Sequence, residues 1–401
     1  MMANDTVTPS RNASLKRILK GETPTVLLYR SSTNARLGEA LSELAALHGN
    51  SLGVGVVVRI PPHTPRSIKS YLEQHTEVPL LLADPEIHVS PVSGWPRATP
   101  LRARAAAHAY LTSVPTKPSR AWVASVVNTQ FELGATLPLS ASGWVGDVNP
   151  KVDLRAAMAF VAESRSVLGD QPMLVNLTMS SRWLSEPALR DILLNEMVES
   201  EEIRWYLRFD WPLMKVRYRQ LLDDSILRGY RELATSFAVE DRQLYLANSG
   251  LSGWLSTAFG ATGFSTGQSW SEQKFSPDPV VASRKGTPRP TPVPRILDPK
   301  LMHTVDYNEF LRLEGFPNHM DSPTSFSLTM DTDGHAKDLA GLHHVTTVGN
   351  LQASLTGGQR SVLALRRVKA AQKFLDELDP VDRPTGADQP QHLPIWRSLL
   401  S

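Results

Sequence analysis

Three carboxylates and two arginines stand at the ends of short apolar runs in this 401-residue sequence. The carboxylates are Asp84, Glu86 and Asp210, and the arginines are Arg59 and Arg208. Carboxylates can act as general acids, general bases or nucleophiles, and guanidinium groups bind anions. Since the chain contains no cysteine, we expect these carboxylates to carry any catalysis and the arginines to neutralise an anionic substrate.

The apolar run at residues 203–209, IRWYLRF, predicts which of these groups point inward. Side chains of a strand alternate between its two faces. One face of the run is apolar, and the other carries Arg204, Tyr206, Arg208 and Asp210. Burying two unpaired arginines would cost several kcal/mol each, so we expect carboxylates or an anionic ligand to pair with them. An ion network that only fills the protein interior is the alternative.

Small residues follow the last two apolar runs, in the stretches LANSG and GATGFSTG. Such residues let backbone N–H groups approach a ligand, and a helix that begins there adds partial positive charge. In this feature the segment resembles the phosphate-binding (β/α)8-barrel enzymes, which implies an anion site at this end of a barrel. Tight turns alone would explain the same glycines and serines. The predicted anion-binding residues are Arg59, Asn176, Arg208, Ser249, Gly250, Ser265, Thr266 and Gly267.

Two other patterns in the same region point to different chemistry. Gly263, Ser265 and Gly267 fit the Gly-x-Ser-x-Gly elbow of hydrolases, but a polar and then proline-rich stretch follows where that elbow needs a helix. The last apolar runs also look like the barrel of the tRNA-guanine transglycosylases. Those enzymes carry a zinc site built mainly from cysteines, which this chain lacks. Base or glycosyl exchange is therefore kept as a minor alternative.

The composition limits partners and cofactors. Lys and Arg total 42 against 40 Asp and Glu, a net charge of +2, so nucleic acid is not indicated as a partner. Without cysteine the chain has no Cys-ligated zinc and no iron–sulfur cluster. No Gly-x-Gly-x-x-Gly turn follows the first apolar run, so no nicotinamide or flavin fingerprint is present. Mg²⁺ is kept as a candidate cofactor. The sequence has neither a secretory signal nor a membrane-spanning stretch, so we expect a cytoplasmic protein.

The elements that must position these groups are eight predicted strands. Most are followed by an amphipathic stretch, which predicts parallel strands joined by helices. Eight such units indicate an α/β fold, a (β/α)8 TIM-type barrel, with an open doubly wound sheet as the alternative. The predicted strands span residues 25–30, 52–60, 79–83, 121–127, 173–178, 203–209, 243–247 and 261–265.

The chain outside the barrel has a different composition. Residues 1–20 are predicted to form a mobile arm and residues 21–270 the barrel. Residues 271–304 are proline-rich and should form an extended linker or strap. Residues 305–401 are predicted to form a helical extension that could bind a second copy or another protein.

These features predict a barrel enzyme that acts on an anionic small molecule, a phosphorylated sugar or a nucleotide, at the barrel mouth. A hydrolase, a lyase or a glycosyl transferase would fit such a site. The alternative is a non-catalytic barrel that binds a protein or a nucleic acid through its C-terminal extension, because a fold does not determine a function.

Overall fold

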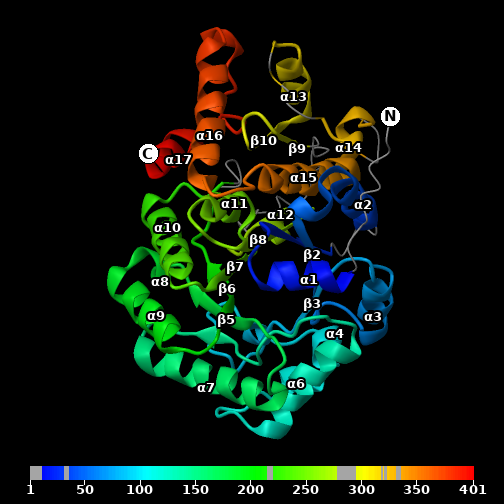
Figure 1. Cartoon of the computed structure of the whole chain (residues 1–401), viewed down its shortest axis with the longest axis vertical. Coiled ribbons are helices and arrows are strands. Elements are labelled where there is room, and N and C mark those ends of the chain that lie inside the picture. The colour runs from blue at the N-terminus through cyan, green and yellow to red at the C-terminus, as the bar shows by residue number, and fades with distance from the viewer. Residues whose placement is uncertain are drawn as a thin grey trace, which may run out of the picture.

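A computed structural model describes most of the chain, and its centre is a curled sheet of eight parallel strands (Figure 1). The strand order is β3-β2-β1-β8-β7-β6-β5-β4. The described residues are 11–30, 36–214, 220–277, 295–317, 319, 323–330 and 336–401. The strands are β1 (Thr25–Tyr29), β2 (Gly53–Arg59), β3 (Leu80–Asp84), β4 (Trp144–Val145), β5 (Val175–Ser180), β6 (Arg204–Asp210), β7 (Gln243–Ala247) and β8 (Gly263–Gly267).

An extended segment lies between the edge strand β3 and the start of β5. The Thr136 N–H group donates to the carbonyl of Leu81 in β3 at 2.8 Å. Three residues later, Leu139 forms a parallel bridge with Leu174, just before β5. The sheet therefore curls into the predicted TIM-like α/β barrel.

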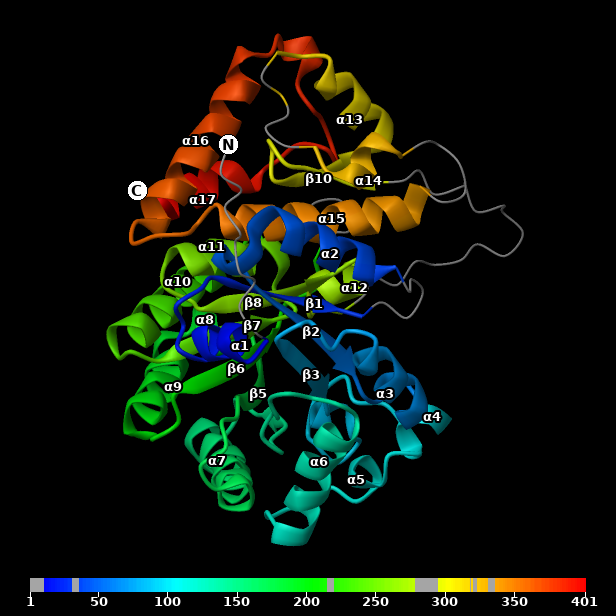
Figure 2. The same cartoon turned by 45° about the vertical axis from the view of Figure 1, so that its right-hand side comes forward.

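Helices alternate with the strands and surround the sheet (Figures 1 and 2). Side chains along each strand alternate between the helix layer and the barrel interior. In β6, Trp205, Leu207 and Phe209 pack in the outer apolar layer, and Tyr206 packs inside the barrel. The inward face predicted for residues 203–210 is thus confirmed. The helices are α2 (Leu37–His48), α3 (Pro65–Glu73), α4 (Ala103–Ala106), α5 (Ala109–Thr112), α6 (Arg120–Glu132), α7 (Pro150–Leu168), α8 (Arg182–Ser185), α9 (Pro187–Glu199), α10 (Asp224–Val239) and α11 (Gly250–Ala258).

The prediction of a strand at residues 121–127 is wrong, because this segment lies in helix α6. Ser119 caps the helix by accepting a hydrogen bond from the Trp122 N–H group. The buried positions 122, 123, 126 and 127 follow helical spacing rather than alternation. The fourth strand is instead the two-residue β4, which lies in a glycine- and serine-containing stretch without an apolar run.

A short helix closes the amino-terminal end of the barrel. Helix α1 (Arg11–Leu19) places Ile18 in the interior apolar cluster. The carbonyl of Leu19 accepts hydrogen bonds from the side chains of Arg204 and Gln243, at 2.8 and 2.6 Å. Part of the segment predicted as a mobile arm is therefore a helix bonded to two strands, and residues 1–10 lie outside the described residues.

The C-terminal region stands beside the barrel and supplies one of its helices (Figure 2). Helix α15 (Ala336–Ala353) packs against α2 and α11, in the position of a helix following β8. Trp254 of α11 donates a hydrogen bond to the carbonyl of Leu351 at 3.0 Å. Residues 278–294 of the predicted strap lie outside the described residues. The elements of this region are α12 (Trp270–Gln273), β9 (Arg295–Asp298), β10 (His303–Asp306), α13 (Tyr307–Glu314), α14 (Ser325–Leu328), α15 (Ala336–Ala353), α16 (Arg360–Glu377) and α17 (His392–Leu400).

Candidate functional site

A buried ion pair lies at the carboxyl-terminal ends of the strands, which we call the mouth. Asp84 ends β3 and Arg208 lies in β6, and both side chains are fully buried. The Arg208 Nη2 atom donates to Asp84 Oδ2, so Asp84, one of the predicted carboxylates, pairs with Arg208. Burial disfavours the charge on Arg208, but Asp84, the two tyrosines Tyr29 and Tyr206, and Glu86 together outweigh it and hold the pKa of the guanidinium well above its usual value.

The phenol of Tyr29 joins this pair to two further strands. Its hydroxyl lies 2.9 Å from the hydroxyl of Tyr206 and 3.0 Å from Asn248 Oδ1. Arg208 Nη2 donates to the same hydroxyl at 3.0 Å. Burial raises the pKa of Tyr29 to about 12, so the phenol stays protonated at neutral pH. Residues from β1, β3, β6 and the end of β7 thus form one buried polar network.

Glu86 lies beside this network in a strained backbone conformation. Its φ is 42°, in the left-handed region, which costs a residue with a Cβ atom about 1–2 kcal/mol. The Glu86 N–H group donates to Asp84 Oδ1 at 3.0 Å, which holds the turn. Glu86 Oε1 accepts a hydrogen bond from Arg59 at 2.8 Å, while Oε2 has no hydrogen-bond partner among the described residues. The side chain is only 3% exposed, so this oxygen is a buried acceptor for which the described residues supply no donor.

Asp210, the third predicted carboxylate, binds a loop instead of the network. Arg97 donates to both of its oxygens, at 2.6 and 3.1 Å, and Trp95 Nε1 donates at 3.0 Å. Burial raises the pKa of Asp210, although Trp95 and Arg97 oppose the shift. The loop after β3 is thereby attached to the end of β6.

Two aromatic rings from distant segments stack over the mouth. Trp95 and Phe275 lie 5.3 Å apart with an angle of 18° between their planes, and the Arg97 guanidinium lies 5.0 Å from the Phe275 ring centre. The Phe275 carbonyl accepts a hydrogen bond from the Trp211 N–H group at 2.7 Å. Residues 87–97 and 270–276 together form a cover over the Asp84–Arg208 pair, which we call the lid.

His88 lies beneath the two rings of the lid. Its ring packs edge-on against Trp95 and Phe275, at 5.0 and 5.3 Å. Nδ1 lies 3.4 Å from the Thr178 hydroxyl, and Nε2 has no hydrogen-bond partner among the described residues. Burial and the nearby arginines hold the pKa of His88 well below its usual value, so the ring is neutral. A neutral imidazole carries a hydrogen-bond donor on one ring nitrogen and an acceptor on the other.

The predicted phosphate subsite at the ends of β7 and β8 is closely packed. The Ser265 hydroxyl accepts a hydrogen bond from the Asn248 N–H group at 2.7 Å, and Ser249 donates to the carbonyl of Leu246. Thr266 lies 3.4 Å from His344, and a Cβ atom on Gly267 would clash with Glu272. The cavity lined by Ser249 and Gly250 is about 10 Å³, enough for one water but not for a phosphate. An anion here would require these side chains to move.

The structure thus places only some of the predicted site residues next to one another. The structure brings Asp84, Glu86, Arg59 and Arg208 into one region. Asn176 is buried in β5 opposite Tyr206 in the register, and its Oδ1 atom has no hydrogen-bond partner in the described part of the chain. Sequence reasoning missed Tyr29, although alternation with Leu27 indicates its inward face. Nothing in the sequence marked Trp95, Arg97 or Phe275, because their loops have no regular period.

Positive charge surrounds the outer part of the mouth. Arg59 is 39% exposed and ends β2, and Arg30 follows β1. Burial lowers the pKa of His63 to about 4, and Arg30, Arg59 and Arg104 add to this shift by repulsion. Arg30, Arg59 and Arg104 thus lie near His63 at this edge of the mouth.

The fold and this network define an α/β barrel with a buried, charged mouth. No model of a known protein family matches the chain, and no curated protein matches it either. Within the described residues, no helix is both long and apolar enough to cross a bilayer, and no cluster of three or more His, Asp or Glu side chains could hold a metal ion. Mg²⁺ as a cofactor stays a prediction.

Proposed function

We propose that this barrel is an enzyme that binds an anionic small molecule at its mouth and uses Glu86 for acid–base chemistry. The observation that carries this proposal is the state of Glu86. Its carboxylate is buried, held by Arg59 through one oxygen, and without a donor on the other among the described residues. A strained residue of this kind is typical of functional sites.

The other two predicted carboxylates have supporting roles in this proposal. Asp84 is occupied by Arg208 and by the Glu86 N–H group, so it positions Glu86. Asp210 is occupied by Arg97 and Trp95, so it holds the lid. A proton-transfer group needs an unoccupied oxygen that can reach the substrate. Glu86 meets this requirement, and His88 Nε2 is a second group without a hydrogen-bond partner in the described structure.

The substrate class follows from charge. Arg30 and Arg59 lie at the edge of the mouth, where they would attract a phosphate or a carboxylate group. A sugar phosphate or a nucleotide fits this requirement. Because Asp84 and Arg208 are sealed by the lid, binding near Glu86 requires the lid to open.

The full burial of the Asp84–Arg208 pair also favours a second candidate, a non-catalytic barrel in which the network only stabilises the interior. The test is a thermal-shift screen of phosphate, sugar phosphates, nucleotides and short oligonucleotides. It uses the wild type, Arg59→Gln, and Arg165→Gln as the matched control, because Arg165 also pairs with a glutamate.

A ligand at 100 times its Kd stabilises the native state by about 2.7 kcal/mol, which raises Tm by a few degrees. We expect a small anion to raise the Tm of the wild type and of Arg165→Gln, and to raise that of Arg59→Gln much less. A shift with oligonucleotides alone, or no shift at all, would favour the non-catalytic candidate.

A further inference from the structure

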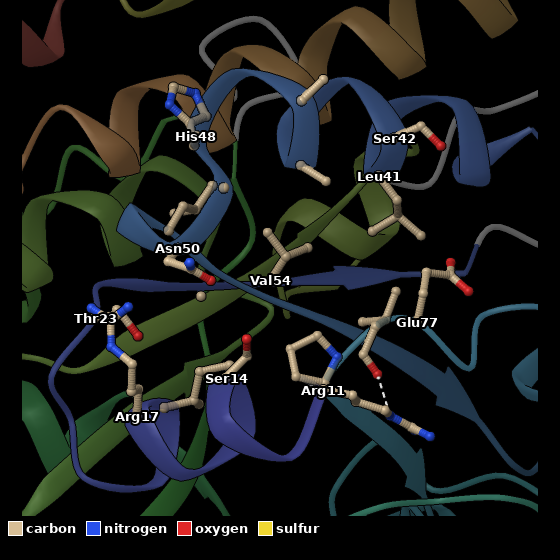
Figure 3. Close-up of a pocket in the computed structure, with 18 residues that line it drawn as sticks. Arg11, Ser14, Arg17, Thr23, Leu41, Ser42, His48, Asn50, Val54 and Glu77 are labelled. Atoms are coloured by element: carbon tan, nitrogen blue, oxygen red, sulfur yellow. Dashed lines mark hydrogen bonds between the residues drawn. The ribbon is translucent and has the colours of Figure 1, made fainter. Parts of the chain in front are cut away.

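A cleft lies at the amino-terminal end of the barrel, away from the mouth (Figure 3). Its volume is about 600 Å³, within the range of small-molecule sites. Strand β2 runs from Gly53, which lines the cleft, to Arg59 at the mouth. At roughly 3.3 Å per residue, these ends are about 20 Å apart. A molecule in the cleft would therefore not touch Glu86.

One wall of the cleft is apolar. Figure 3 shows Leu41 of α2 and Val54 of β2 at the cleft. Ala45 of α2 also lines it, with Val78 and Pro79 just before β3. Such a surface favours an apolar ligand body, since each buried CH₂ group contributes about 0.8 kcal/mol. A hydrocarbon or aromatic part of a ligand would fit this wall.

The opposite wall is formed by α1 and is polar. Figure 3 shows the Ser14 hydroxyl pointing from α1 into the cleft, with Arg17 and Asn50 at one end. Arg17 Nε lies 3.6 Å from Glu22 Oε2 at the surface, so the carboxylate neutralises the charge of Arg17 only in part. Arg11 lies at the other end with Glu77, and its Nε atom donates to the Val78 carbonyl at 3.0 Å. The positive charge thus dominates at the Arg17 end.

We propose that this cleft binds a small organic anion with an apolar body, its acidic group at Arg17 and its body against Leu41, Ala45 and Val54. The neighbouring Thr23 is 4% exposed, and its hydroxyl has no hydrogen-bond partner among the described residues. The site is separate from the proposed active site and would be occupied whether or not the mouth is catalytic.

The test uses the fluorescent aryl sulfonate 1-anilinonaphthalene-8-sulfonate and its uncharged analogue N-phenyl-1-naphthylamine. Ala45→Trp fills the apolar wall, and Leu47→Trp is its control, because Leu47 lies on the same helix but outside the cleft. Arg17→Gln removes the charge, with Lys16→Gln of α1 as the control. Circular dichroism checks that each variant folds, and Ser42→Trp on the same wall replaces Ala45→Trp if that variant does not.

We expect saturable binding of the sulfonate, lost in Ala45→Trp and retained in Leu47→Trp. Arg17→Gln should weaken sulfonate binding about tenfold without changing the affinity for the uncharged dye, and Lys16→Gln should change neither. The proposal is overturned if the sulfonate does not saturate, if Ala45→Trp binds like the wild type, or if Arg59→Gln at the mouth abolishes the binding instead.

Discussion

Asp84 and Arg208 pair across the mouth of the barrel although β3 and β6 are not neighbours in the sheet. Both side chains are fully buried, so each charge depends on the other for its stability in the interior. The pair therefore connects two distant strands.

Asp84→Asn should lower the free energy of unfolding by about 3–5 kcal/mol, because it leaves a buried guanidinium unpaired. The double variant Asp84→Asn/Arg208→Gln should lose less than the sum of the two single variants. Urea titrations followed by circular dichroism measure these values. Glu39→Gln removes an exposed ion pair with Arg36 and should cost about 1 kcal/mol or less. If the losses of unfolding free energy in the two single variants add up to that of the double variant, the coupling between Asp84 and Arg208 is contradicted.

The lid should loosen when its ion pair is removed. Asp210→Asn or Arg97→Gln eliminates a charge-assisted pair worth about 1.5–3 kcal/mol, so opening of the lid should become at least tenfold more frequent. Hydrogen exchange of peptides covering residues 87–97 and 270–276 reports this change. Arg182→Gln, which breaks an exposed pair with Glu186, is the control. Unchanged exchange in both lid variants would show that aromatic stacking alone holds the lid.

The sequence was sufficient for most of the barrel because its strands are apolar runs with distinct ends. The runs at 25–30 and 243–247, for example, coincide with β1 and β7 to within one residue. The helix at 120–132 was misread because valine and tryptophan are also typical of strands. Strand β4 has two residues and gave no periodic signal.

The site was harder to predict than the fold. Asp84, Glu86 and Arg208 could be selected because they end or line predicted strands. The partners Arg97 and Phe275 come from loops, and their positions depend on contacts far apart in the sequence. The serines after β7 and β8 indicated a phosphate site, but their hydroxyls are bonded within the protein.

Acid should destabilise the C-terminal region through two stacked histidines. His303 of β10 and His392 of α17 lie 5.5 Å apart and are buried. Burial lowers the pKa of His303 to about 4, with Arg295 adding to the shift and Asp388 opposing it, and lowers that of His392 well below its usual value.

Because the unfolded chain binds these protons more readily, stability should fall as the pH drops from about 6.5 towards 4. The slope should be about 1.4 kcal/mol per pH unit for each histidine. Urea titrations between pH 7 and 5 measure it. His392→Phe should reduce the slope, whereas a slope equal to that of the wild type would exclude His392 as a contributor.

The most direct test of the proposed function separates binding from turnover in Glu86→Gln. The small anion that stabilises the wild type is incubated with each protein, and its conversion is followed by NMR. Glu202→Gln is the matched control, because Glu202 pairs with Arg165 at the other end of the barrel as Glu86 pairs with Arg59. We predict that Glu86→Gln binds the anion with turnover reduced at least a hundredfold, while Glu202→Gln turns it over at the wild-type rate. Equal turnover in Glu86→Gln and the wild type, or none in either, would contradict the assignment of Glu86 as the acid–base group.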